Sequence, residues 1–150
     1  MIDIPKKISL VRIMRDWLDS RLIKLPWPKV NPSYISFVSL VFSIFFVFIW
    51  LYGDKWLAAF ILFLGLTLDW IDGLVARKYH EASSKGWMID VLTDRLSEGI
   101  IFSYAASFYP WFSLFLINCL LSFLSFKIKR HLIMPLRQLF LVYIFFLLIF

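Results

Sequence analysis

Acidic side chains interrupt the apolar stretches of this 150-residue chain at four positions. Asp69 and Asp72 are three residues apart, and Asp90 and Asp94 are four residues apart. Because residues at these spacings share one face of an α-helix, each pair presents two carboxylates on the same side. An ionisable group inside a membrane-spanning segment is costly to bury and indicates a function. The four carboxylates therefore predict a site that binds cations.

The side chains around these acids indicate which cation binds and which reaction the site supports. Four carboxylates in one pocket repel one another or take up protons, and divalent cations remove that conflict. Oxygen ligands suit Mg²⁺, Mn²⁺ or Ca²⁺, and the absence of His and Cys from the set makes zinc a poor fit. Arg77 follows directly, and a guanidinium beside bound metal ions indicates a phosphate ligand. We therefore expect phosphoryl transfer, with small residues leaving space beside the acids: Gly73, Ala76 and Gly86.

Apolar segments make up most of the rest of the chain. Hydrophobic residues account for 61% of it, whereas soluble domains contain roughly 45–50%. A mean hydropathy of +0.81 likewise indicates that the bilayer is the solvent. Five segments reach or approach the roughly 20 residues that a transmembrane helix requires. The sequence thus predicts an all-α protein, a polytopic transmembrane helical bundle with spans at residues 33–52, 56–77, 87–108, 110–126 and 132–150.

The connections and the N-terminal stretch complete this organisation. Tight links at Gly53-Asp54 and Tyr109-Pro110 predict antiparallel neighbouring helices. In residues 5–24 apolar side chains recur near a 3.6-residue period, which predicts an amphipathic helix in the membrane interface; a helix that docks onto a partner is the alternative. We expect an amphipathic juxtamembrane segment at residues 1–30 and a transmembrane domain at residues 31–150, whose first span begins at Asn31-Pro32.

The basic residues predict how the bundle is oriented. Of the 16 Lys and Arg residues, all but Lys55 and Arg95 fall on one side of an alternating topology. The positive-inside rule then places the N-terminus and the loop at residues 77–86 in the cytoplasm. We therefore expect an integral, multi-pass membrane protein whose acidic site faces the cytoplasm. Nucleic acid is not expected as a partner, because the positive charge lies next to the membrane and not on a soluble surface.

The spacing of the acidic residues resembles the signature of the CDP-alcohol phosphatidyltransferases. That signature reads D-x2-D-G-x2-A-R-x8-G-x3-D-x3-D, and residues 69–94 match it at every fixed position. The resemblance implies a membrane enzyme of phospholipid biosynthesis (EC 2.7.8.-). Such an enzyme moves a phosphatidyl-type group from a CDP-linked lipid to a small alcohol, free or phosphorylated, and releases CMP. It also implies two Mg²⁺ or Mn²⁺ ions as cofactors, membrane lipids as surroundings and a homodimer.

The resemblance further implies roles for individual residues. Asp69, Asp72 and Asp90 would ligate the metal pair, with Asp69 and Asp90 shared between the ions. Asp94 would be the general base that takes the proton of the acceptor hydroxyl, and would also touch the second metal. The residues between the acids would form the donor-binding set, in which Gly73 and Arg77 contact the CDP moiety and Ser83 adds a phosphate contact: Gly73, Ala76, Arg77, Ser83 and Gly86.

Two features depart from the family pattern and leave alternatives open. Ser33 and Ser36 stand where Asn and Thr are usual at the start of the first span. Family members usually have six spans and five are counted, so we expect the chain to lack the last one. A catalytically inactive membrane scaffold is one alternative function. A divalent-cation transporter using the same carboxylates is another, but it would need acids spread across the membrane depth.

Charged residues outside the motif receive separate interpretations. Arg95 and Glu98 are three residues apart in the third span, so we expect them to pair with each other or with a neighbouring helix. A second group of basic residues surrounds the start of the fifth span. Its members are expected to set the topology, and a pocket for a phosphorylated acceptor such as glycerol 3-phosphate or inositol phosphate, with Arg137 best placed in it, is the alternative: Lys127, Lys129, Arg130 and Arg137.

Overall fold

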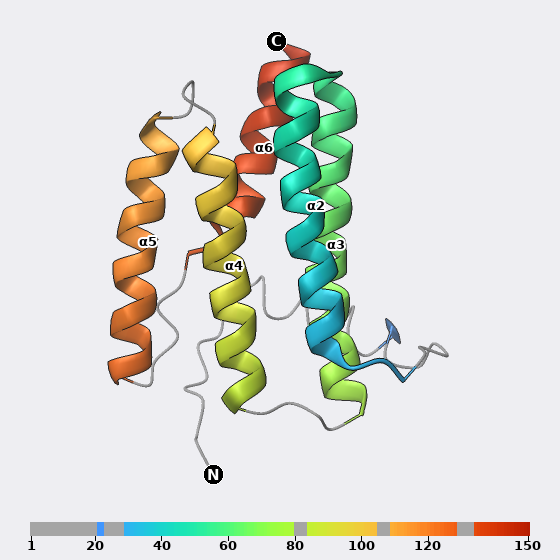
Figure 1. Cartoon of the computed structure of the whole chain (residues 1–150), viewed down its shortest axis with the longest axis vertical. Coiled ribbons are helices and arrows are strands. Elements are labelled where there is room, and N and C mark those ends of the chain that lie inside the picture. The colour runs from blue at the N-terminus through green and yellow to red at the C-terminus, as the bar shows by residue number, and fades with distance from the viewer. Residues whose placement is uncertain (1–20, 23–28, 80–83, 105–108, 129–133) are drawn as a thin grey trace.

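A computed structural model describes residues 21–22, 29–79, 84–104, 109–128 and 134–150. Long helices account for nearly all of these residues, and none of them lies in a strand. The all-α prediction is therefore confirmed for the described part of the chain (Figure 1). The helices are α2 (Pro32–Tyr52), α3 (Lys55–Lys78), α4 (Ser84–Tyr104), α5 (Tyr109–Ile128) and α6 (Leu136–Ile149).

Local hydrogen bonds define the ends of the helix hairpin formed by α2 and α3. The Asn31 side chain caps α2 by accepting from the backbone N–H of Ser33 at 3.0 Å. The Gly53 N–H donates to the Ile49 carbonyl at 2.8 Å where α2 ends. Asp54 then caps α3 by accepting from the N–H of Leu57 at 2.8 Å. The predicted tight connection is confirmed.

Other boundaries differ from the prediction, and prolines explain two of the differences. The third segment, predicted at residues 87–108, forms a helix that begins at Ser84 and ends at Tyr104. Pro110 lies in the first turn of α5 and not in a connection, because a first turn needs no N–H at that position. The last helix begins after Pro135 and not at residue 132.

Candidate transmembrane helices are present, as the hydropathy predicts. Helices α2 and α3 are long and apolar enough to cross a membrane. The apolar parts of the last two helices are shorter, at Tyr109–Ser125 and Leu136–Ile149. The chain is a membrane protein with candidate spans, and the number of five spans stays a prediction. The predicted amphipathic helix at residues 5–24 lies almost entirely outside the described residues.

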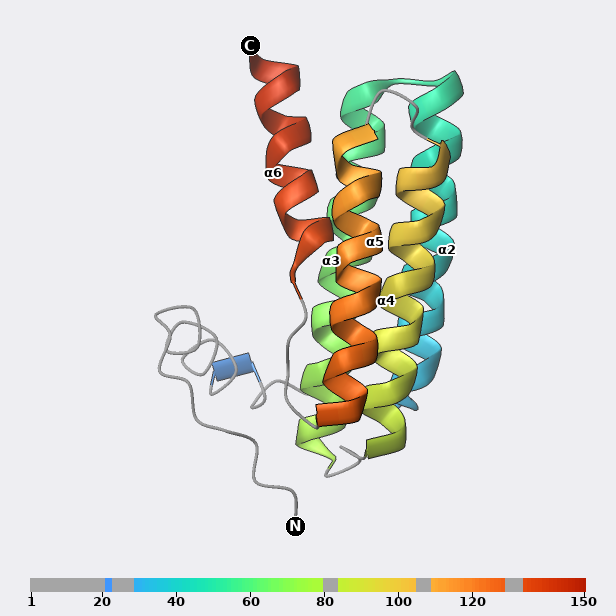
Figure 2. The same ribbon diagram turned by 90° about the vertical axis from the view of Figure 1, so that its left-hand side faces the viewer.

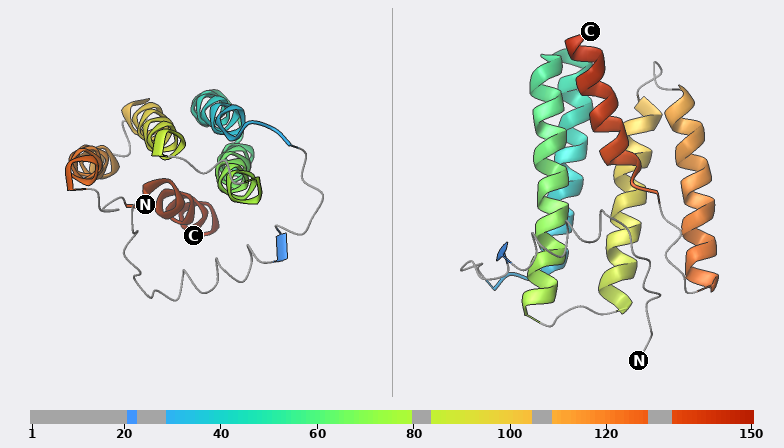
Figure 3. Two further views of the ribbon diagram at one scale, coloured as in Figure 1. Left: turned by 90° about the horizontal axis from the view of Figure 1, so that it is seen from below. Right: turned by 180° about the vertical axis from the view of Figure 1, so that it is seen from behind.

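The helices are arranged around α6. Helix α2 packs against both α3 and α4, α5 packs on the far side of α4, and α6 contacts α3 and α5. Seen end-on, α5, α4, α2 and α3 follow an arc with α6 on its inner side (Figure 3). Figure 2 shows α6 beginning part-way along the bundle. The helices with the acidic pairs, α3 and α4, thus each pack against α2 and lie on either side of it.

Aromatic packing attaches α6 to the other helices. The buried ring of Phe140 lies 6.1 Å from the ring of Phe46, 5.0 Å from that of Phe102 and 5.2 Å from that of Trp111, measured between centroids. In lipid, such packing and not the exclusion of water holds helices together. Because Arg137 precedes Phe140 by three residues, the same face of α6 carries Arg137 into the bundle.

Small residues bring α2 and α3 close together. The Ser39 hydroxyl donates to the Gly65 carbonyl at 2.9 Å, and a β-carbon on Gly65 would lie 3.1 Å from Cβ of Phe42. Glycine and serine at membrane helix interfaces allow this approach. The contact fixes how α2 and α3 are aligned, and Ser36, one turn before Ser39, then faces Asp72.

Candidate active site

The first two motif carboxylates that meet are those of Asp72 and Asp90. Ser36 Oγ lies 2.7 Å from Asp72 Oδ2 and 3.3 Å from Asp90 Oδ1. A hydroxyl has one proton to donate, and the shorter contact to Asp72 is the better hydrogen bond. Asp72 is only 4% exposed. Ser36 therefore joins one carboxylate from α3 and one from α4 through a neutral group on α2.

The other two carboxylates, those of Asp69 and Asp94, meet at Arg137. The guanidinium Nη2 of Arg137 lies 3.0 Å from Asp69 Oδ2 and also forms an ion pair with Asp94 Oδ1. The Arg137 side chain is only 3% exposed, whereas those of Asp69 and Asp94 are 20% and 28% exposed. Helix α6 thus places a buried positive charge between Asp69 on α3 and Asp94 on α4.

The order of these contacts follows from the antiparallel course of α3 and α4. Asp72 lies six residues before the end of α3, and Asp90 lies six residues after the start of α4. Asp69 and Asp94 lie nine and ten residues from the same two ends. At 1.5 Å per residue these depths are about 9 Å and about 14–15 Å along the helix axes. Residues at equal depth on the two helices therefore share a bridging group, Ser36 or Arg137.

Gly73 and Arg77 form a second feature on α3. A β-carbon on Gly73 would lie 3.2 Å from Arg77 Nη1, so the guanidinium folds back over the glycine. Ala76 and Gly86 are half-buried on α3 and α4. Ser83 lies outside the described residues. The structure therefore brings Gly73 and Arg77 together and leaves the role of Ser83 as a prediction.

The chemistry of the acidic side chains fits a divalent metal. Every group that joins or forms the two pairs, apart from Arg137, offers oxygen, which Mg²⁺ and Mn²⁺ prefer. Within the described residues, no three acidic, His or Cys side chains already stand close enough together to hold an ion. The oxygen ligands suit a metal ion. At Asp69 and Asp94, however, the guanidinium of Arg137 already supplies the positive charge that a metal ion would supply.

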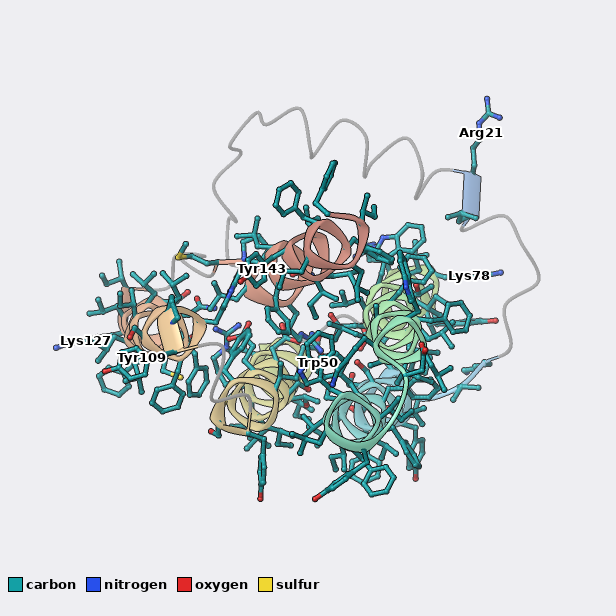
Figure 4. The ribbon with its side chains drawn as sticks, turned by 90° about the horizontal axis from the view of Figure 1, so that it is seen from above. Arg21, Trp50, Lys78, Tyr109, Lys127 and Tyr143 are labelled. Carbon is teal, nitrogen blue, oxygen red and sulfur yellow. The ribbon has the colours of Figure 1, made fainter. Side chains whose placement is uncertain are left out.

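The sequence does not predict the contacts of Ser36. It also groups Arg137 with the neighbouring basic residues that are expected to set the topology. Ser36 stood out only as a departure from the family pattern, although it belongs to a run of buried serines on α2 at helical spacing. Lys127 points away from the bundle, as expected for a charge that sets topology (Figure 4). Arg137 is instead buried among the acids. Residues 129–130 lie outside the described part of the chain.

Arg95 and Glu98 pair with each other, as expected from their spacing. Arg95 Nη1 lies 2.7 Å from Glu98 Oε2, and Nη2 donates to Oε1 at 3.0 Å. Glu98 also accepts a hydrogen bond from Asn118 on α5, at 3.2 Å to Oε2. No sequence pattern predicts a role for Asn118, because an isolated asparagine in an apolar segment has no partner that spacing can reveal.

Comparisons with known proteins agree with the motif. The profile of the CDP-alcohol phosphatidyltransferase family matches residues 29–150. A CDP-diacylglycerol–inositol 3-phosphatidyltransferase from Saccharomyces cerevisiae is 31% identical over 112 residues. That match covers 75% of this chain but only 38% of the yeast protein. No solved structure matches the chain significantly. Since the family profile extends over most of the chain, including every motif residue, the chain belongs to the CDP-alcohol phosphatidyltransferase family.

Proposed function

We propose that this protein transfers a phosphatidyl-type group from a CDP-linked lipid to a small alcohol and releases CMP. The observation that carries the proposal is the meeting of motif carboxylates from two helices, Asp72 with Asp90 and Asp69 with Asp94. Membership of the family supports the same reaction class. The donor, the acceptor and the activity of the whole protein are all parts of this proposal.

The four acids have distinct roles in the proposed reaction. Asp69, Asp72 and Asp90 would hold the cations, and Asp94 would accept the proton of the acceptor hydroxyl. Two Mg²⁺ or Mn²⁺ ions, when bound, neutralise the charge of the diphosphate and polarise the phosphorus under attack. The acceptor oxygen then forms its bond to phosphorus as the bond to CMP breaks, in a single displacement. Asp94 suits this role because its side chain is the more exposed of the Asp69–Asp94 pair.

The donor would be held by the residues between the acids. Arg77 carries a guanidinium that suits a phosphate, and Gly73 gives it room to lie along α3. Half-buried Ala76 and Gly86 are small enough for a bulky nucleotide to approach the helices closely. Ser83 would add a phosphate contact from the connection between α3 and α4.

Arg137 suggests what kind of acceptor the site uses. Its ion pairs have to open before Asp69 and Asp94 can both ligate or react, and the released guanidinium would then lie in the site beside the general base. Such a group suits a phosphate on the acceptor. The yeast relative is named for transfer to inositol. We therefore propose a polyol acceptor, with phosphorylated forms such as inositol phosphate or glycerol 3-phosphate favoured by Arg137.

The cellular setting is proposed on the same basis. We propose five spans on the basis of hydropathy, a site that faces the cytoplasm on the basis of the basic residues, and a homodimer on the basis of the family resemblance. The two alternative functions require different arrangements of the acids. An inactive scaffold would not need the acids to meet, and a transporter would need acids along the whole depth of the membrane. The contacts among the acids favour the enzyme.

Acceptor-dependent release of CMP tests the proposal directly. Purified protein in lipid nanodiscs is supplied with CDP-diacylglycerol, Mg²⁺ or Mn²⁺, and one acceptor at a time. The acceptors are inositol, inositol phosphate, glycerol 3-phosphate and serine. We expect CMP release that requires both the metal and one acceptor, together with a new phospholipid. Failure of every acceptor with both metals would contradict the proposal, and CMP without a new lipid would indicate hydrolysis instead.

A further inference from the structure

A buried amide on α5 holds the segment that leads into α6. Asn118 is fully buried, and its Nδ2 donates to the Met134 carbonyl at 3.0 Å. Its Oδ1 accepts from the Met134 N–H at 2.9 Å. One side chain therefore satisfies both backbone polar groups of a single residue on another segment. This pairing fixes the position and the direction of the chain at Met134.

The start of α6 depends on this pairing because it lacks a cap of its own. Pro135 precedes the helix, has no N–H and provides no side-chain cap hydrogen bond. Local backbone hydrogen bonds also form here: the Leu136 N–H donates to the Met134 carbonyl at 2.9 Å and the Leu139 N–H to the Pro135 carbonyl at 3.1 Å. In a lipid environment a backbone group without a partner is expensive, and the amide of Asn118 satisfies the N–H and the carbonyl of Met134 just before the helix begins.

Glu98 determines which way the Asn118 amide faces. An ionised carboxylate can only accept hydrogen bonds, so the NH₂ group of Asn118 has to point toward it. The distance from Asn118 Nδ2 to Glu98 Oε2 is 3.2 Å, and Glu98 is itself paired with Arg95. Glu98 lies one turn after Asp94 on α4. The helix that carries the proposed general base therefore also orients the amide that anchors α6.

Arg137 follows Met134 by three residues, so an anchor at Met134 controls where the guanidinium lies. We propose that Asn118, oriented by Glu98, is a positioning residue that holds the start of α6 so that Arg137 reaches Asp69 and Asp94. The inference rests on the proposed function for its catalytic meaning. The chain of contacts from Glu98 to Arg137 can nevertheless be tested without turnover.

The experiment is a double-mutant cycle between Asn118→Leu and Arg137→Gln. Leucine keeps the approximate size of the side chain and removes both hydrogen bonds to Met134. Two properties are measured in nanodiscs without substrate: hydrogen exchange of the first turn of α6, and the affinity for Mn²⁺ alone. Ser122→Ala is the matched control, because Ser122 is also buried on α5 and loses one hydrogen bond, to the Asn118 carbonyl at 2.8 Å.

We expect Asn118→Leu to speed hydrogen exchange at the start of α6 and to tighten Mn²⁺ binding by about fivefold, because Arg137 no longer competes well for the acids. In the Arg137→Gln background the same substitution should leave Mn²⁺ affinity unchanged, since residues in one network are not additive. Ser122→Ala should change neither property. Equal effects of Asn118→Leu in both backgrounds, or no effect on Mn²⁺ in either, would overturn the proposal and leave a purely structural role.

A second variant covers the case in which Asn118→Leu does not fold. Asn118→Asp combined with Glu98→Gln keeps the size of both side chains and reverses the hydrogen bond between them. It removes the hydrogen bond that the Met134 carbonyl receives from α5, so the same Arg137-dependent change in Mn²⁺ affinity is expected. An unchanged Mn²⁺ affinity in this folded variant would also overturn the proposal. A wild-type protein that binds Mn²⁺ but releases no CMP would contradict the proposed function and leave this inference to be decided by the cycle.

Discussion

The two carboxylate pairs of the candidate site are joined by different kinds of group. Asp72 and Asp90 share the neutral hydroxyl of Ser36, whereas Asp69 and Asp94 share the guanidinium of Arg137. A neutral bridge leaves the negative charge of its pair uncompensated, and a cationic bridge offsets it. We therefore expect the Asp72–Asp90 pair to favour a cation strongly, and the Asp69–Asp94 pair to exchange Arg137 for one.

This difference also suggests a division of work within the site. The Ser36 side lies nearer the connection between α3 and α4, and its Asp72 is almost fully buried, as suits a residue that only binds. The Arg137 side lies deeper along both helices, and its acids are more exposed than Asp72, as suits a residue that exchanges a proton with an acceptor. Five substitutions can break or sharpen this comparison.

The largest effect is expected from Asp94→Asn. An amide cannot take the acceptor's proton, so CMP release should fall by about 10²–10⁴-fold, the usual contribution of a general base. Mn²⁺ binding should be largely retained, because the other three acids remain. CMP release and Mn²⁺ affinity are measured on the same preparation. Activity close to that of the wild type would remove Asp94 from the role of base and make the two pairs functionally alike.

Arg137→Gln tests the cationic bridge itself. Without the guanidinium, the Asp69 and Asp94 carboxylates face each other uncompensated, and breaking a buried ion pair costs about 3–5 kcal/mol. The metal-free variant should therefore unfold at a lower temperature than the wild type. Addition of Mn²⁺ should recover more stability in the variant than in the wild type. If Mn²⁺ stabilised both proteins equally, Arg137 and the metal would not compete for the same carboxylates.

Ser36→Ala tests the neutral bridge and should have a smaller effect. Partners that orient a metal-binding side chain typically change metal affinity by about tenfold or more when removed. We expect Mn²⁺ binding to weaken by about tenfold, opposite in sign to the tightening expected from Arg137→Gln. Ser39→Ala is the matched control, since Ser39 is equally buried one turn away and its hydroxyl donates to the Gly65 carbonyl instead of a carboxylate. Equal weakening in both variants would mean that helix packing, and not the Asp72–Asp90 contact, is responsible.

The sequence predicted the acids of this site better than the groups between them. The spacing of Asp69, Asp72, Asp90 and Asp94 gives their common faces and their depths, because both depend only on helical geometry and on the short link between α3 and α4. Ser36 and Arg137 come from helices that are distant in sequence, so their approach depends on packing that no local pattern encodes.

The helix boundaries show the same limit. The N-cap residues Asn31 and Asp54 mark where α2 and α3 begin, because a cap acts within one turn. The sequence predicts that the last helix begins at residue 132, whereas α6 begins after Pro135, because a hydropathy pattern does not register a missing N–H. Its anchor, Asn118, lies on another helix. Local signals thus predicted local structure, and the contacts that complete the site were tertiary.

Gly73→Ala should have the smallest effect and tests whether the side of the site near Asp72 receives the donor. The added methyl group would lie 3.2 Å from Arg77 Nη1, and a flexible guanidinium can move by a few tenths of an ångström to make room. We expect the KM for the CDP-lipid to rise by about threefold, with kcat nearly unchanged, since a loss under 1 kcal/mol of uniform binding raises KM alone. Arg77→Ala should raise the same KM further, because it removes the guanidinium itself. A change in the acceptor KM instead would move Arg77 to the acceptor side and reverse the division of work between the two pairs.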